Sequence, residues 1–222
     1  MLTSLTSASS ISSIPPLENG DRLSRYEFEQ RYQAMPHLKK AELIEGVTYM
    51  ASPLRIRSHS EPHGLLMTWL GTYRAFTPGI VLGDSPTVRL DFNNELQPDA
   101  VLFVPGRQAT IGVDDYIEGA PELVVEIAAS SAAIDLHDKK LVYRRNHVQE
   151  YLVWRTLEQQ FDWFMLQADE YISLAADDQG MLRSRVFPGL WLAMPALLMG
   201  DMATVLMKLQ EGLNAPEHED FK

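Results

Sequence analysis

Cysteine is absent from the chain, and long apolar runs are absent as well. Without cysteine, disulfides, thiolate metal sites and cysteine nucleophiles are excluded. Proteins of the reducing cytoplasm usually lack disulfides, so we expect a cytoplasmic protein. No apolar run reaches the roughly 18 residues that a membrane-spanning helix requires, so we expect no membrane partner.

Basic residues are also few. The chain has 19 Lys and Arg against 30 Asp and Glu, which gives a formal net charge of −11. A protein that binds many phosphates usually carries a basic excess on its contact face, so this acidity counts against a nucleic-acid partner. Net charge does not locate that face, however, and divalent ions can bridge two negative partners. The acidity alone therefore does not exclude DNA.

The length and composition predict one globular domain. The chain has 222 residues, of which 45% are hydrophobic and 22% charged, as is ordinary for such a domain. The Ser/Thr-rich start lacks the basic and apolar regions of a secretory signal, so we expect a disordered tail over residues 1–22. We expect a single domain over 23–213 and a frayed polar tail over 214–222.

Several helices can be placed from capping and periodicity. Ser24 with Glu27 has capping-box spacing and predicts a helix that ends near Ala34. Ser60 can cap a second helix, and the segment from Ala133 to Asn146 predicts a third. Asp201 can cap a helix over 202–213. The second helix should bury one stripe, formed by Leu66, Trp69, Leu70 and Tyr73.

Strands are indicated by short apolar runs between turn residues. We expect strands within 43–50 (with Gly46 at a turn), within 80–92 on either side of residues 84–86, and over 99–104, 122–128 and 151–154, with a loop over 105–121. Three further runs, within 161–187, resemble a meander. The fold class is therefore α/β, with a mixed central β-sheet flanked by helices and a C-terminal β-meander.

Two acidic residues stand out against this pattern. Asp99 opens one apolar strand, and Glu126 lies within the next, between Val125 and Ile127. A strand buried on both faces should be almost continuously apolar. A carboxylate inside such a strand costs free energy unless it has a partner, so the pair suggests a functional site.

A lysine on the following helix completes a set of candidates. Asp135, Lys139 and Tyr143 are spaced by four residues and share one helix face, and Lys140 is adjacent. We interpret His59 and His63 as ordinary polar or capping residues, since no metalloprotease-type histidine signature is present.

Asp99, Glu126 and a lysine supply what phosphodiester hydrolysis by a metal nuclease requires. Mg²⁺ binds one or two carboxylates and keeps several waters. The ion activates water and neutralises charge on the phosphate. A lysine beside the water orients it and stabilises the transition state.

The motifs PDAVLFV, ELVVEIAAS and DLHDKKLVYRRNHVQEYLVW, together with ELIEG and VFPGLWL, resemble the Uma-type restriction-endonuclease family in their order and spacing. This family lies within the PD-(D/E)xK nuclease superfamily, and the resemblance covers about residues 24–200. It implies a restriction-endonuclease-like core and Mg²⁺-dependent cleavage of DNA, with Mn²⁺ able to substitute. It also implies that Asp99 and Glu126 bind the metal and that Glu42, otherwise interpreted as a solvated strand residue, is an auxiliary ligand or hydrogen-bond partner.

The chain departs from the superfamily pattern at one position. Ala128 stands two residues after Glu126, where the superfamily has its lysine. The resemblance implies that the lysine has moved to the following helix. Lys139 fits this role best, and Lys140 remains an alternative.

Other functions stay open at this stage. The chain could be a non-catalytic nuclease-fold protein that binds nucleic acid or regulates, since a fold does not establish activity. It could also be an unrelated hydrolase that uses two carboxylates, for instance on sugars. Cutting both DNA strands requires two sites, so we expect a homodimer. Phe161, Trp163, Phe164 and Met165 would form either its interface or part of the core.

Overall fold

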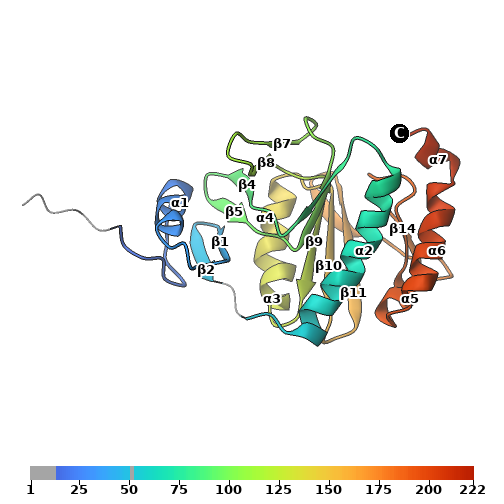
Figure 1. Cartoon of the computed structure of the whole chain (residues 1–222), viewed down its shortest axis with the longest axis horizontal. Helices are drawn as coiled ribbons and strands as arrows, with labels where there is room; N and C mark the ends of the chain where they lie inside the picture. The colour runs from blue at the N-terminus through green and yellow to red at the C-terminus, as the bar shows by residue number, and fades with distance from the viewer. Residues whose placement is uncertain (1–13, 51–52) are drawn as a thin grey trace, which may run out of the picture.

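The computed structural model describes residues 14–50 and 53–222, and the fold is mixed α/β (Figure 1). Within these residues the strands form two six-stranded sheets and one two-stranded sheet. Helices cover the central sheet on both sides: Figure 1 shows α2 and α6 on one side and α3 and α4 on the other. The predicted α/β class, with a mixed sheet flanked by helices, is confirmed.

The central sheet has the strand order β12-β11-β10-β9-β6-β3. All six residues of its inner strand β9 are buried, as its apolar sequence predicts. β9 runs parallel to β10 and antiparallel to β6, so the sheet is mixed. Its strands are β3 (Val81–Asp84), β6 (Ala100–Phe103), β9 (Leu123–Ala128), β10 (Glu150–Arg155), β11 (Gln160–Gln167) and β12 (Glu170–Ser173).

The second six-stranded sheet, ordered β2-β1-β5-β4-β8-β7, shares an apolar core with the central sheet. Val88 and Ile117 from the second sheet pack in one cluster with Val101 and Val124 from the central sheet. Its strands are β1 (Ala41–Ile44), β2 (Val47–Met50), β4 (Val88–Asp91), β5 (Asn94–Leu96), β7 (Ala109–Ile111) and β8 (Ile117–Gly119).

The loop expected over residues 105–121 is wrong in part, because this segment contains the hairpin β7–β8. β8 extends the second sheet by pairing with β4, and Ala109 and Ile117 are buried there. Gly119 makes this close packing feasible. Its φ is +91°, and a Cβ at this position would lie 2.3 Å from the carbonyl oxygen of Gln108.

The helix α2 (Glu61–Phe76) buries the stripe that its periodicity predicts: Leu66, Trp69, Leu70 and Tyr73 are each 0% exposed. It packs against α6 (Met202–Leu213), and α5 (Met194–Leu198) joins the same core. The expected cap at Ser60 is wrong, because α2 continues from a π-helical turn, η1 (Ile56–Ser60), and the Ser60 side chain makes no capping hydrogen bond.

The helical segment that follows β9 is also irregular. It consists of α3 (Ala132–Ile134), a π-helical turn η2 (Asp135–Lys139) and α4 (Lys140–Arg145). Single π-turns inside α-helices occur frequently at functional sites. η2 carries the lysine that the sequence singles out.

Both ends of the chain pack more closely than expected. Residues 1–13 of the expected N-terminal tail lie outside the described residues, but Leu17 is 3% exposed and packs with Phe28 beneath α1 (Arg25–Gln33). Leu17, together with backbone hydrogen bonds of Gly20 and Asp21 to Thr48, therefore attaches this part of the expected tail to the folded domain. The prediction of a disordered tail failed here because a single buried apolar residue, Leu17, is not recognisable within a Ser- and Pro-rich segment.

The C-terminal segment is likewise no frayed tail. His218, in α7 (Pro216–Glu219), is fully buried. Its Nδ1 lies 2.8 Å from the carbonyl oxygen of Leu213, and its Nε2 lies 2.8 Å from Thr77 Oγ1 at the end of α2. These contacts hold the terminus against the ends of α2 and α6.

The expected C-terminal meander is confirmed for its first two runs, because β11 and β12 pair antiparallel, and β11 also pairs antiparallel with β10. The run within 181–187 does not join it, because β13 (Met181–Arg183) pairs instead with β14 (Trp191–Ala193) in a separate sheet. Trp163 and Phe164 of β11 are 2% and 7% exposed and belong to the core. Within residues 14–50 and 53–222, no helix is long and apolar enough to cross a membrane.

Candidate metal-dependent active site

Asp99 and Glu126 lie opposite each other on neighbouring strands. β6 pairs with β9 in a register that sets Ala100 against Val125, so that Asp99 and Glu126 are the next opposed pair. Opposed residues of an antiparallel pair point to the same face of the sheet. The Asp99 Oδ2 accepts a hydrogen bond of 2.7 Å from the backbone N–H of Ile127, which fixes this carboxylate beside β9. The two residues are 5% and 3% exposed.

Lys139 reaches the same place from η2. Its Nζ lies 3.0 Å from Glu126 Oε1 and 2.9 Å from Glu42 Oε1, and the lysine is 4% exposed. Glu42, on β1, also accepts a hydrogen bond of 2.8 Å from the backbone N–H of Gln97. The structure thus brings together the four residues that the sequence singles out, and it turns Lys139 rather than Lys140 towards the acids.

A third carboxylate, that of Asp135, also lies close to Lys139. Asp135 Oδ1 lies 3.7 Å from Lys139 Nζ, and Ser131 Oγ donates a hydrogen bond of 2.6 Å to Asp135 Oδ2. Tyr143 Oη donates a hydrogen bond of 2.9 Å to Glu126 Oε1. The sequence predicted that Asp135, Lys139 and Tyr143 share one helix face, but it indicated no role for Asp135 or Tyr143. Their four-residue spacing was the available signal.

The charges of this cluster keep the lysine protonated. Burial on its own would lower the pKa of Lys139, but the negative charges of Glu126, Glu42 and Asp135 outweigh this and raise its pKa well above the ordinary value. The amine is therefore present as ammonium across the physiological range. It can donate hydrogen bonds and stabilise negative charge, and it is unsuited to act as a general base.

The two strand carboxylates have opposite pKa shifts. Burial raises the pKa of Glu126, and the nearby Lys139 charge only partly offsets this, since Asp135, Asp99 and Glu42 raise it further. Burial also acts to raise the pKa of Asp99, but the hydrogen bond from His59, the charge of Lys40 and the N–H of Ile127 together bring it below the ordinary value. Asp99 is thus ionised at neutral pH.

Two histidines, His59 and His63, contact Asp99. The interpretation of both as ordinary polar or capping residues did not include these contacts. His59 Nε2 lies 3.3 Å from Asp99 Oδ1, and its buried Nδ1 has no hydrogen-bond partner among the described residues. His63 Nε2 lies 3.0 Å from the carbonyl oxygen of Asp99. Lys40 Nζ lies 3.8 Å from Asp99 Oδ1. No local sequence pattern could predict these contacts, because His59, His63 and Lys40 are distant from Asp99 in the sequence.

The oxygen donors suit a hard divalent ion. Asp99 and Glu126 supply two carboxylates, which is the number that Mg²⁺ commonly takes from a protein while it keeps water ligands. In residues 14–50 and 53–222, no group of three or more His, Asp or Glu side chains is arranged to hold a metal ion. Asp99 and Glu126 are the two carboxylates that face each other across β6 and β9, so each could supply an oxygen ligand to an ion.

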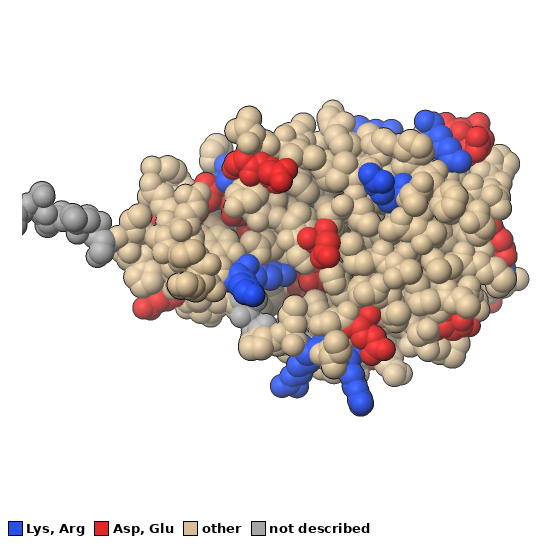
Figure 2. All heavy atoms as spheres, in the orientation of Figure 1, with Lys and Arg blue, Asp and Glu red and all other residues tan. Residues whose placement is uncertain are grey.

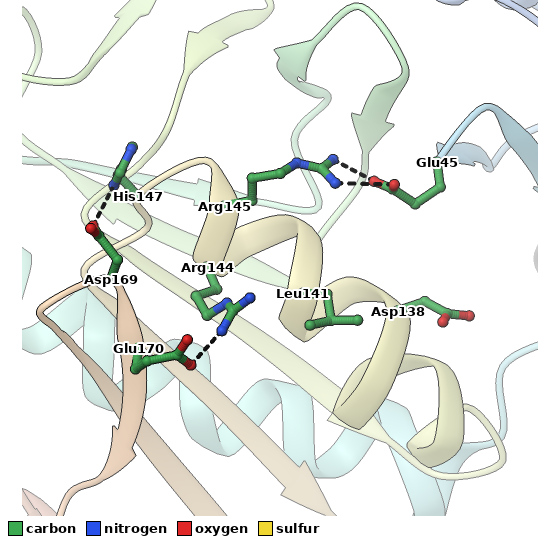
Figure 3. Close-up of a pocket in the computed structure, with 8 residues that line it drawn as sticks. All are labelled: Glu45, Asp138, Leu141, Arg144, Arg145, His147, Asp169 and Glu170. Atoms are coloured by element: carbon green, nitrogen blue, oxygen red, sulfur yellow. Dashed lines mark hydrogen bonds and ion pairs between the residues drawn. The ribbon is translucent and has the colours of Figure 1, made fainter.

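A surface pocket of about 540 Å³ lies elsewhere, along the outer side of η2 and α4 (Figure 3). Its basic side chains already face acids: Arg145 pairs with Glu45, and Arg144 pairs with Glu170. Asp99, Glu126, Lys139 and Glu42 do not line it. The pocket is thus separate from the carboxylate cluster.

Comparisons with known proteins place the chain in a family. Comparison with curated proteins gives no significant match. Among solved structures, the chain is similar to one described as a putative nuclease belonging to DUF820, from Anabaena variabilis ATCC 29413. The TM-score is 0.55 at 13% identity, over 83% of this chain and 97% of the other, which shows a shared fold. The model of the Uma2 family, described as "Putative restriction endonuclease", matches residues 26–195. The chain therefore belongs to the Uma2 family.

Proposed function

We propose that the protein is a divalent-metal-dependent DNA endonuclease that hydrolyses phosphodiester bonds, with Mg²⁺ as its ion and Mn²⁺ as a substitute. One observation carries the proposal: two buried carboxylates face each other on neighbouring strands, and a buried ammonium group lies 3.0 Å from one of them. Membership of the Uma2 family and the shared fold with a structure described as a putative nuclease support the same function.

In this proposal each residue has a distinct role. Asp99 and Glu126 hold the ion. When bound, the ion would neutralise charge on the scissile phosphate and make its water a better nucleophile. Lys139 orients the attacking water and stabilises the negative charge that develops on the phosphate oxygens, because it stays protonated.

Two further carboxylates position the lysine. Glu42 and Asp135 approach Lys139 Nζ from β1 and η2, at 2.9 and 3.7 Å. Glu42 is itself anchored by the N–H of Gln97, and Asp135 is anchored by Ser131. The ammonium group is thus held on several sides in a site from which water is largely excluded, where electrostatic stabilisation is strongest.

A plasmid assay tests the proposal. Supercoiled DNA is incubated with the protein and Mg²⁺ or Mn²⁺, beside the variants Asp99→Asn and Glu126→Gln. We expect metal-dependent nicking in the wild type and a loss of at least a hundredfold, about 3 kcal/mol of transition-state stabilisation, in both variants. Glu122→Gln is the matched control. Glu122 is also fully buried and adjoins β9, but it accepts a hydrogen bond from the N–H of Val104 and takes no part in the cluster.

The assay also decides between the proposal and its non-catalytic alternative. Cleavage that persists without divalent ions, or that survives in Glu126→Gln, would refute the metal-dependent site. Tight binding of DNA by the folded wild type, with no cleavage under any metal condition, would favour a nuclease-fold binding protein instead.

A further inference from the structure

Some cations beside the proposed site have no acidic partner. Acidic residues outnumber basic ones by 30 to 19 in this chain, and most of the arginines form ion pairs. Lys39, Arg55 and Arg57 are exposed, and none of the three forms an ion pair with an acid in the part of the chain that the structure describes. In an acid-rich protein, such cations leave their charge available to a partner.

These cations lie on the two segments that contact Asp99. Lys39 precedes Lys40, whose Nζ is 3.8 Å from Asp99 Oδ1. Arg57 stands two residues before His59, whose Nε2 is 3.3 Å from the same oxygen. The carbonyl oxygen of Arg55 accepts hydrogen bonds from the backbone N–H groups of His59 and Ser60. The η1 turn therefore fixes the backbone of both arginines relative to His59. We call Lys39, Lys40, Arg55 and Arg57 the basic rim.

The basic rim is continuous with exposed apolar side chains. Leu54 and Ile56, which alternate with the two arginines, are 65% and 69% exposed. Leu157, also 69% exposed, joins them because Thr156 Oγ1 donates a hydrogen bond of 2.7 Å to the carbonyl oxygen of Ser58. Figure 2 shows basic side chains on the surface between the β1–β2 hairpin and the start of α2.

We propose that the basic rim holds the phosphate backbone of duplex DNA on either side of the scissile phosphate. This inference rests on the proposed function, because it takes the carboxylate pair as the point of cleavage. A nucleic-acid strand presents a phosphate at every nucleotide, so the cations nearest the carboxylates meet the phosphates that flank the cleaved one. Leu54 and Ile56 lie where they can contact sugars and base edges.

The charge distribution supports this partner. With a net charge of −11, the chain as a whole repels DNA, and the carboxylate cluster adds to this repulsion locally. Binding therefore requires cations at the site itself. Arginine suits this task because its planar guanidinium is always charged and matches phosphate geometry.

The test measures binding separately from cleavage. The full chain carrying Glu126→Gln is titrated against a fluorescein-labelled duplex by anisotropy, over a series of salt concentrations. Each lost phosphate contact lowers the slope of log K against log salt by about 0.9 for duplex DNA. Arg55→Gln with Arg57→Gln should therefore lower the slope by about 1.8 and weaken binding by about 60-fold at about 0.1 M salt.

Arg74→Gln with Arg185→Gln is the matched control. These arginines are also exposed and form no ion pair within the described residues, so the pair removes the same charge. Arg74 is in the last turn of α2, at the opposite end from His63, and Arg185 follows β13. We expect its slope to equal that of the Glu126→Gln background. A second double variant, Arg55→Lys with Arg57→Lys, keeps both charges and should keep the slope.

Each outcome bears on one claim. An equal change of slope in the rim and control variants would overturn the inference, because it would show that only net charge acts. Tighter binding of a single strand than of the duplex would overturn the choice of duplex DNA. Loss of binding in the rim variants alone supports the contact between the basic rim and DNA, and a wild type that never cleaves would then refute the proposed function and not this contact. If the wild type cleaves DNA and the rim variants bind it as tightly as the Glu126→Gln background, the inference about the basic rim is wrong and the proposed function is unaffected.

Discussion

Replacing Lys139 with methionine tests the centre of the proposed site. Methionine keeps most of the volume and apolar character of the lysine stem but removes the charge. In the native protein the ammonium group faces Glu42, Glu126 and Asp135 at 2.9, 3.0 and 3.7 Å. Its removal leaves three buried carboxylates close together without the cation that they share.

The structure sets the size of the effect. Removing one partner of a buried ion pair costs about 3–5 kcal/mol, because an uncompensated charge remains out of water. The three carboxylates can take up protons, which limits the loss, so we expect a decrease of about 3–5 kcal/mol in the free energy of unfolding. For a domain of this size, the corresponding decrease in Tm is about 6–20 °C. Metal-dependent cleavage should be lost as well.

Lys140→Met is the natural control for this experiment. Lys140 is adjacent in the sequence, but its Nζ lies 3.5 Å from the centre of the Phe164 ring and faces no carboxylate within hydrogen-bonding distance among the described residues. The loss of a cation–π contact at this half-buried position costs about 0.5–2 kcal/mol. Urea unfolding at neutral pH measures both free energies, and plasmid nicking by the folded fraction measures activity.

Two results would contradict this reasoning. If Lys139→Met were as mild as Lys140→Met, the three carboxylates would not depend on the ammonium group. If Lys139→Met were strongly destabilised and yet its folded fraction cleaved DNA at the wild-type rate, Lys139 would be a structural residue and the water-orienting role would be wrong.

Two further predictions concern stability away from the site. Burial and the adjacent Glu29 raise the pKa of Glu95 to about 8 from an ordinary value of 4.5, so the native state keeps a proton that the unfolded chain releases. The free energy of unfolding should therefore fall as the pH rises from about 4.5 to about 8. Glu95→Gln should remove this dependence, which amounts to at most about 1.4 kcal/mol per pH unit and is measured by urea unfolding at several pH values. An unchanged pH dependence in the variant would show that Glu95 ionises freely. His218→Ala should cost about 2–4 kcal/mol, because it removes two buried hydrogen bonds and leaves a cavity. Exposed Glu219→Ala should cost almost nothing, and equal values for the two variants would mean that the C-terminal segment does not dock.

Local patterns in the sequence determined most of the elements. The apolar run around Glu126 predicted a buried strand, and the stripe from Leu66 to Tyr73 predicted the buried face of α2, because burial imposes a period that is visible in a single segment. The same local reasoning placed Lys139 on one helix face with Asp135 and Tyr143. Local patterns failed where short strands lie between turn residues, as in β7 and β8, and where one apolar residue anchors a polar terminus, as Leu17 does.

Only the tertiary structure decided which of these side chains meet. Glu42 and Lys139 are separated by 97 positions in the chain, and no local pattern relates them. The sequence left Lys139 and Lys140 as alternatives, and the packing of η2 against β9 turns the first towards the acids and the second towards Phe164. His59 of η1 and Lys40, which precedes β1, contact Asp99 only because the folded chain brings these segments to the start of β6. The sequence determined the parts because propensity and burial act over a few residues, whereas the site depends on contacts between segments that only the folded chain brings together.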